Sequence, residues 1–100
     1  MSAAVPGWRQ PIAELRYLAA TVGHVHGPTH PDMATLAEVV ATLADSHGDD
    51  HAAHVALARR MRELTDGFNP WSGACGSVHR LYQSLAPIAD VLSPALPKHS

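Results

Sequence analysis

Apolar residues recur at intervals of three and four in four stretches of the chain, and this spacing predicts amphipathic helices. Between the stretches lie short segments that contain glycine and proline, which favour turns. No stretch alternates apolar and polar residues with a period of two, so the sequence predicts no strands. The four predicted helices span about residues 10–22, 32–47, 49–65 and 74–92.

Single residues mark the predicted helix ends. Pro11 suits the first turn of the first helix, because proline lacks the N–H that would have no helical partner there. Asp32 suits the N-cap of the second helix, and Gly67 suits the end of the third. Pro87 removes a backbone hydrogen bond inside the fourth helix, so we expect a kink there or a division into two pieces.

The length of the chain and of its connections predicts the architecture. The chain has 100 residues, 46% of them hydrophobic, which is typical of one globular domain with one core. Connections of roughly five to ten residues favour antiparallel neighbours. The sequence therefore predicts an all-α fold, an up-down-up-down four-helix bundle. We expect the domain to span residues 1–93 and a flexible tail to span 94–100.

Charge and cysteine content narrow the function classes. The formal net charge is −2, and the only cationic group, Arg59, Arg60 and Arg62, suits a solvated helix face, so we expect no nucleic-acid partner. The chain opens with no charged leader, and no apolar stretch approaches the ~18 residues of a membrane span. We therefore expect a cytoplasmic protein without membrane contact. Cys75 is the single cysteine and cannot form an internal disulfide, so we expect a reducing compartment and a thiol that is either packed or idle.

Histidine is the unusual residue type, with eight residues against seven lysines and arginines. Neutral imidazole is the commonest side-chain ligand of metals, and it titrates near neutral pH. Six histidines fall into two groups, one of His24, His26 and His30 and one of His47, His51 and His54. In an antiparallel bundle the two groups lie a helix length apart, so they cannot form one site. The first group should lie at the same end as the turn around Trp71.

The second histidine group is the stronger candidate for a metal site. His47 and His51 are four residues apart and His51 and His54 are three apart, so they share a face if the helix begins before Gly48. Imidazoles at this spacing can chelate iron, zinc, nickel or copper. The alternative is that the histidines of both groups are simply polar residues at solvated helix ends.

Two segments of the chain resemble a known family. The segment from Leu15 to Met33 reads LRYLAATVGHVHGPTHPDM, and that from His51 to Leu85 reads HAAHVALARRMRELTDGFNPWSGACGSVHRLYQSL. Both are similar to the hemerythrin-like domain of the di-iron proteins that repair iron–sulfur clusters. The resemblance implies a hemerythrin-like four-helix bundle, and it places His26 and His51 at positions where the family has metal ligands.

The resemblance to the hemerythrin-like domain is incomplete at the metal centre. The final H-x-x-x-E pair of the family would fall on Ala95 and His99, and another such pair is absent near His47. Both bridging glutamates are therefore missing, so we expect no di-iron centre, because carboxylates must hold the two metal ions together. A reduced site of His51 with His47, His54 or His99 could still hold one metal ion.

Three functional hypotheses follow from the sequence. The leading one is a non-enzymatic helical binding protein, a degenerate hemerythrin-like domain that acts through a protein partner or by forming homo-oligomers. The first alternative is a protein that binds or senses one Fe, Zn or Ni ion through His47, His51 and His54, with His26 as a further candidate ligand. The second alternative, a secreted helical protein, depends on the turn Trp71-Ser72-Gly73, which is similar to the motif of the WxG family.

Overall fold

The computed structural model describes residues 7–46, 48 and 50–93. The described residues form four helices and no strand, which confirms the all-helical prediction. The helices are α1 (Arg9–His26), α2 (Pro31–Asp45), α3 (His51–Leu64) and α4 (Gly76–Leu92). None of them is long and apolar enough to cross a membrane. The tail predicted over residues 94–100 lies outside the described residues.

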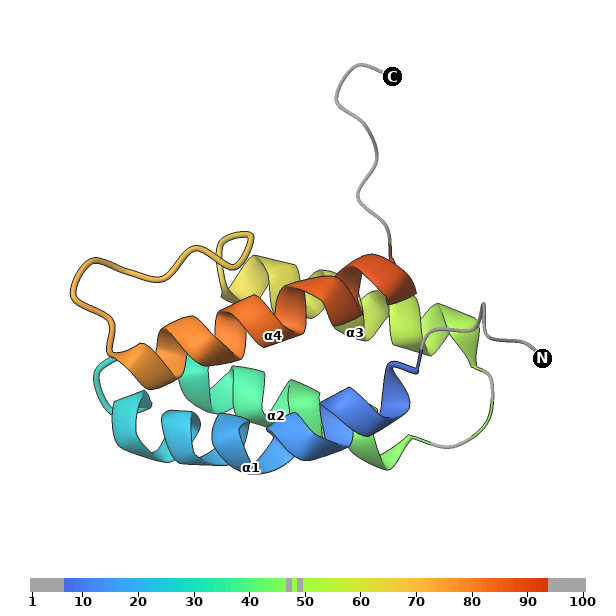
Figure 1. Cartoon of the computed structure of the whole chain (residues 1–100), viewed down its shortest axis with the longest axis horizontal. Coiled ribbons are helices and arrows are strands. Elements are labelled where there is room, and N and C mark those ends of the chain that lie inside the picture. The colour runs from blue at the N-terminus through green and yellow to red at the C-terminus, as the bar shows by residue number, and fades with distance from the viewer. Residues whose placement is uncertain (1–6, 47, 49, 94–100) are drawn as a thin grey trace, which may run out of the picture.

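Consecutive helices run in opposite directions, and the four helices lie side by side around a common core (Figure 1). The helix α1 packs against α2 and α4, and α3 packs against the same two helices from the other side. The contact between α1 and α2 is the most extensive. The turn between α1 and α2 and the loop between α3 and α4 therefore meet at one end of the molecule, which we call the Trp71 end after the tryptophan in that loop.

The first helix is longer than its sequence pattern predicted. It continues past residue 22 to His26, so the predicted end was wrong. Gly23 lies inside α1 and is buried at a close approach to α2. A Cβ atom on Gly23 would lie 2.9 Å from the Cβ of Ala37 and 3.0 Å from the carbonyl oxygen of Met33. Glycine here permits the close approach of two helices, and it does not interrupt α1.

The other helix ends follow local chemistry. The helix α2 begins at Pro31, so His30 and not Asp32 is its N-cap. Proline fits this first position because no N–H partner is needed there. The Asp50 carboxylate caps α3 by accepting a hydrogen bond of 3.1 Å from the backbone N–H of Ala53. The helix α4 runs without a break through Pro87, so the predicted division into two pieces does not occur.

The core is built from aliphatic side chains, as the low aromatic content requires. Each helix contributes buried residues at intervals of three and four, which confirms the apolar stripes read from the sequence. Leu36, Val40 and Leu43 of α2 are fully buried, and so are Leu81 and Leu85 of α4. The burial of these stripes against one another stabilises helices that would be marginal alone.

A turn in the left-handed backbone region ends α3 and orients the loop to α4. The φ angles of Asp66, Gly67 and Phe68 are 53°, 70° and 64°. Residues other than glycine rarely adopt such positive values. Thr65 holds the turn, because its buried hydroxyl accepts a 2.9 Å hydrogen bond from the N–H of Phe68 and donates one of 2.7 Å to the carbonyl of Met61. The fixed turn sets the position of Asp66 at the Trp71 end.

Candidate functional site

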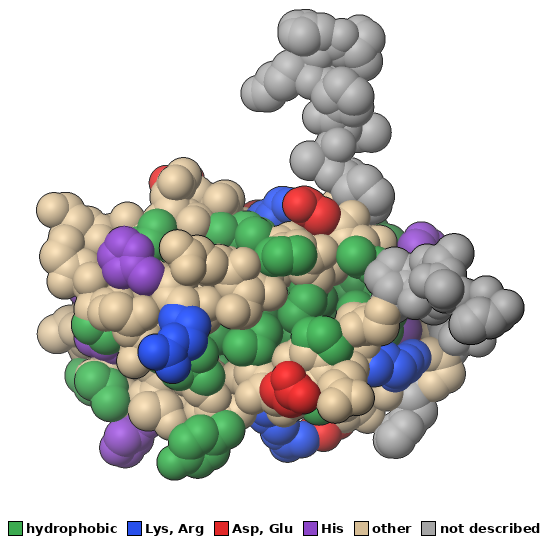
Figure 2. Space-filling model, in the orientation of Figure 1, with side chains coloured by type: hydrophobic (Ala, Val, Ile, Leu, Met, Phe, Trp, Pro, Cys, Tyr) green, Lys and Arg blue, Asp and Glu red, His purple; other side chains and the backbone are tan. Residues whose placement is uncertain are grey.

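An open apolar groove lies between the first turn of α1 and the second half of α4. Its volume is about 370 Å³. Among the described residues, no charged side chain lines it, and Ser84 supplies the only hydroxyl. Figure 2 shows apolar side chains gathered across the middle of this face of the molecule. The residues that line the groove are Gly7, Trp8, Pro11, Ser84, Pro87, Ile88 and Val91.

Val91 forms the exposed edge of this groove. Its side chain is 42% exposed, although Val91 follows the buried Ile88 by only three residues in α4. It is one of three large hydrophobic residues that are exposed in the described part of the chain, the others being Tyr17 and Val25. The spacing of Ser84, Pro87 and Val91 at three and four residues places them on one stripe beside the core stripe. Helical spacing could therefore have indicated this second stripe.

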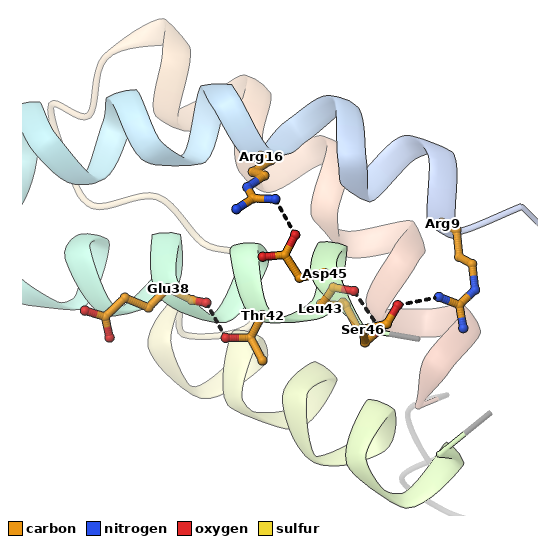
Figure 3. A network of polar contacts seen from close by, with 7 residues as sticks. All are labelled: Arg9, Arg16, Glu38, Thr42, Leu43, Asp45 and Ser46. Carbon is orange, nitrogen blue, oxygen red and sulfur yellow. Dashed lines mark hydrogen bonds and ion pairs between the residues drawn. The ribbon is translucent and has the colours of Figure 1, made fainter. Parts of the chain in front are cut away.

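At the end of the molecule opposite Trp71, polar contacts connect α1 with the end of α2 (Figure 3). The Arg16 guanidinium forms an ion pair with the Asp45 carboxylate. Arg9 donates hydrogen bonds to the backbone carbonyls of Ser46, at 3.0 Å, and of Gly48. These side chains are exposed, so their contribution to stability is small, but they fix the chain direction after α2.

His54 is buried at this same end of the molecule. Its side chain is 5% exposed, and its ring packs edge-on against Trp8 with 4.9 Å between ring centroids. His54 Nε2 lies 3.2 Å from the Ser46 hydroxyl oxygen. The hydroxyl hydrogen of Ser46 goes to the carbonyl of Leu43 at 2.8 Å, so His54 donates from Nε2 to the Ser46 oxygen. That nitrogen therefore forms a hydrogen bond within this end of the domain.

The other predicted metal ligands are spread over the molecule. His51 is the first residue of α3 and is exposed, whereas His54 faces the core, so the two do not share a surface. His47 lies outside the described residues, and Gly48 lies outside α3. His26 is the last residue of α1 and lies next to Trp71. No three His, Cys, Asp or Glu side chains come together as a metal site in residues 7–46, 48 and 50–93. A metal ion bound with the help of His47 stays a prediction.

The Trp71 end gathers two histidines of the first group, as the sequence predicted. The His30 ring stacks on the Trp71 indole with 3.9 Å between centroids and 20° between planes. His26 meets the same indole edge-on at 5.6 Å. His24 is exposed on α1. Stacking on the flat indole gives these histidines a packing role at this turn.

Cys75 has a partner that the sequence did not indicate. It is the N-cap residue of α4 and is exposed, so the thiol is not packed, and the alternative of an idle thiol stays a prediction. Its sulfur lies 3.3 Å from Nε2 of His26. The two residues are 49 positions apart and meet only because the α1–α2 turn adjoins the α3–α4 loop. No spacing pattern could have found a contact that depends on the order of the helices.

A second pocket, of about 380 Å³, opens at the Trp71 end. Its floor is apolar and buried, with Met33, Leu64 and the ring of Tyr82. The stacked pair of His30 and Trp71 lies in its wall. The Tyr82 hydroxyl donates a 3.5 Å hydrogen bond to the Met33 sulfur, which is a weak acceptor.

Burial and, to a smaller extent, the nearby negative charge of Asp32 together raise the pKa of Tyr82 to about 12. In the unfolded chain the phenol ionises near 10. Between pH 10 and 12 the unfolded chain loses its proton first, so the free energy of unfolding should fall as the pH rises, by roughly 2 kcal/mol. Below pH 10 both states are protonated, and Tyr82 contributes no pH dependence.

We therefore expect the Tyr82→Phe variant to lose less stability than the wild type between pH 10 and 12. Urea unfolding of both proteins across this range measures the difference, because other groups that titrate there affect both proteins alike. At pH 7 the two should differ little, since the substitution removes only a weak hydrogen bond to sulfur. Equal losses of stability above pH 10 would contradict the assignment.

No family model matches the chain, and no curated protein or solved structure matches it either.

Proposed function

We propose that this protein is a non-enzymatic helical binding protein that associates with a second copy of itself through the groove between α1 and α4. The observation that carries the proposal is the groove itself, which is apolar, open to solvent and lined by Trp8, Pro11, Pro87, Ile88 and Val91. Exposed contiguous apolar surface is typical of association sites. Aromatic residues are enriched at the centre of such interfaces, and charged residues are depleted there.

Charge on the two helices favours a second copy as the occupant. Glu14 on α1 and Arg80 on α4 are both exposed. Neither forms an ion pair within the described ranges of the chain. Because α1 and α4 run in opposite directions, a residue near the start of each helix lies toward the opposite end of the seam between them. In a two-fold contact across the seam, Glu14 of one copy can therefore face Arg80 of the other, and the reverse.

The shape of the face also suits a contact between two identical surfaces. Val91 projects at the rim of a hollow that Trp8 and Pro11 help to form. Such a two-fold contact places the same patch on both copies, so a projection and a hollow on one patch can fill each other. The groove is small, so we expect a weak dimer with a dissociation constant of about 1–100 μM.

We also propose a topology and a family relationship for the helical domain. We take the domain to be an up-down-up-down four-helix bundle, a shortened hemerythrin-like domain without the di-iron centre. The alternating helix directions support this assignment. The loss of the family's bridging glutamates is consistent with a role in association. No contact in the described residues favours the single-metal or the secreted alternative, and both remain predictions.

Sedimentation equilibrium with two matched variants tests the proposed function. Val91→Glu places a charge in the apolar contact, and we expect it to weaken the dimer at least about tenfold, because an unpaired carboxylate would be desolvated there. Tyr17→Glu is the control. It also puts a carboxylate in place of an exposed hydrophobic residue, but Tyr17 does not line the groove. A wild-type protein that is monomeric at millimolar concentration, or equal effects of the two variants, would contradict the proposal.

The same experiment can distinguish a self-contact from a contact with another protein. Glu14→Arg and Arg80→Glu should each weaken the dimer by placing like charges opposite each other. The variant that carries both changes should recover the wild-type constant, because the pair is restored with reversed sign. Failure of the double variant to recover, with Val91→Glu still disruptive, would exclude the proposed two-fold arrangement.

A further inference from the structure

The pocket at the Trp71 end carries an unbalanced negative charge. Asp32 and Asp66 line it, and no lysine or arginine of the described part of the chain does. Within the described residues neither carboxylate takes part in an ion pair. The negative charge of Asp32 reaches into the pocket, since it helps to raise the pKa of Tyr82 at the floor.

The position of Asp66 adds to this negative charge. It follows the C-terminal end of α3, where the helix dipole is already negative and an acidic side chain is unfavourable. It also has a φ angle of 53°, in the left-handed region. The left-handed turn is the C-terminal cap of α3, because the Gly67 N–H donates to the Arg62 carbonyl at 2.9 Å and the Asp66 N–H donates to the Glu63 carbonyl at 3.4 Å. This cap places the Asp66 side chain at the mouth of the pocket.

The uncharged lining of the pocket indicates what the rest of a ligand would be like. The floor of Met33, Leu64 and Tyr82 is apolar and buried, and the stacked Trp71 forms an aromatic wall. The Tyr82 hydroxyl is buried and donates to sulfur, so its oxygen is available to accept a hydrogen bond. Because the His30 ring covers one face of the indole, the attraction for a cation comes from the two carboxylates, and the apolar floor attracts a small hydrocarbon body.

We propose that this pocket binds a small organic ammonium ion with an apolar body. The ammonium group would lie between Asp32 and Asp66 near Trp71, and the body would contact the floor. A divalent metal ion suits the pocket less well, because hard cations require several oxygen ligands and the floor offers none beyond the phenol. This site lies apart from the α1–α4 groove and does not depend on the proposed self-association.

The test is a titration with phenethylammonium chloride followed by ¹H–¹⁵N NMR. The indole N–H of Trp71 should shift, and that of Trp8, which lies outside the pocket, should not. We expect a dissociation constant of about 0.1–1 mM for so small a ligand in an open pocket. Phenethyl alcohol, the neutral analogue of similar shape, should bind at least about tenfold more weakly, because it lacks the charge.

Charge-neutralising variants identify the carboxylates. Asp66→Asn keeps a side chain that tolerates the left-handed conformation, and we expect it to weaken binding about tenfold. Asp32→Asn should have a similar effect. Glu38→Gln is the matched control, since it removes one negative charge from the exposed surface of α2 outside the pocket, and it should leave binding unchanged. The proposal would be overturned by equal binding of the alcohol, by tighter binding of Ca²⁺ or Mg²⁺, or by no response at Trp71.

Discussion

Replacing Gly23 by valine should destabilise the domain by about 3 kcal/mol, because the side chain would overlap α2 at the closest approach of two helices. The first added atom alone would lie 2.9 Å from the Ala37 Cβ, and 3.0 Å from the Met33 backbone oxygen. Neither atom is the end of a flexible side chain, so α1 and α2 would have to separate. The gain in helix propensity over glycine is only a few tenths of a kcal/mol and cannot offset this cost.

Thermal or urea unfolding of Gly23→Val, compared with Gly76→Val, measures the effect. Gly76 begins α4, and a Cβ atom there would meet nothing within 4 Å, so its valine variant should change stability by less than about 0.5 kcal/mol. If both variants are equally stable, the close approach of α1 and α2 described above is incorrect.

The second large effect is expected from Leu85→Ala in the centre of α4. Leu85 is fully buried, so truncation removes apolar contacts and leaves a cavity among the four helices. Such substitutions cost about 2–5 kcal/mol. A domain of this size has a total stability of about 5–10 kcal/mol, so the variant should lose a large part of its free energy of unfolding.

Val25→Ala provides the matched truncation at an exposed apolar position. Val25 is 61% exposed, so its loss should cost less than about 0.5 kcal/mol. Denaturant unfolding of Leu85→Ala and Val25→Ala beside the wild type gives both values. A small effect of Leu85→Ala would mean that the core lies elsewhere than between the four helices.

The number of helices, their order and most core residues could be predicted from the sequence, because apolar spacing reports the buried side of a helix directly. The errors lie where tertiary contacts decide. Gly23 and Pro87 have the local chemistry of helix breakers, yet both lie inside helices. Close packing on α2 accounts for the glycine. The proline lies inside α4, where a helix held by tertiary packing tolerates one missing backbone hydrogen bond.

The candidate sites were harder to predict than the fold. Each joins residues from segments far apart in the chain, such as Trp8 with Val91 in the groove and Asp32 with Asp66 in the pocket. Their proximity depends on which helices are neighbours and on the register between them, and a single sequence reports neither. The histidine content of the sequence indicated a metal site. In the structure His54 is buried, and its Nε2 donates a hydrogen bond to Ser46.

Asp32 has a second role in the structure that its position in the sequence did not indicate. Asp32 is a residue of a kind that stabilises the start of a helix, and this local role remains true. The same carboxylate also faces a pocket that contains Asp66 from another turn. A residue can therefore satisfy a local rule and still belong to a candidate site that only the tertiary structure reveals.

Contact between the α1–α4 faces of two copies can be observed directly by isotope-filtered NOE spectroscopy. In a mixture of ¹³C-labelled and unlabelled chains, the Val91 methyl groups of labelled molecules should show cross-peaks to protons of unlabelled molecules near Trp8 and Pro11. The Tyr17 ring, outside the contact, should show none. If the Val91 methyl groups contact only protons of their own chain at concentrations well above the expected dissociation constant, the groove is not a self-association surface.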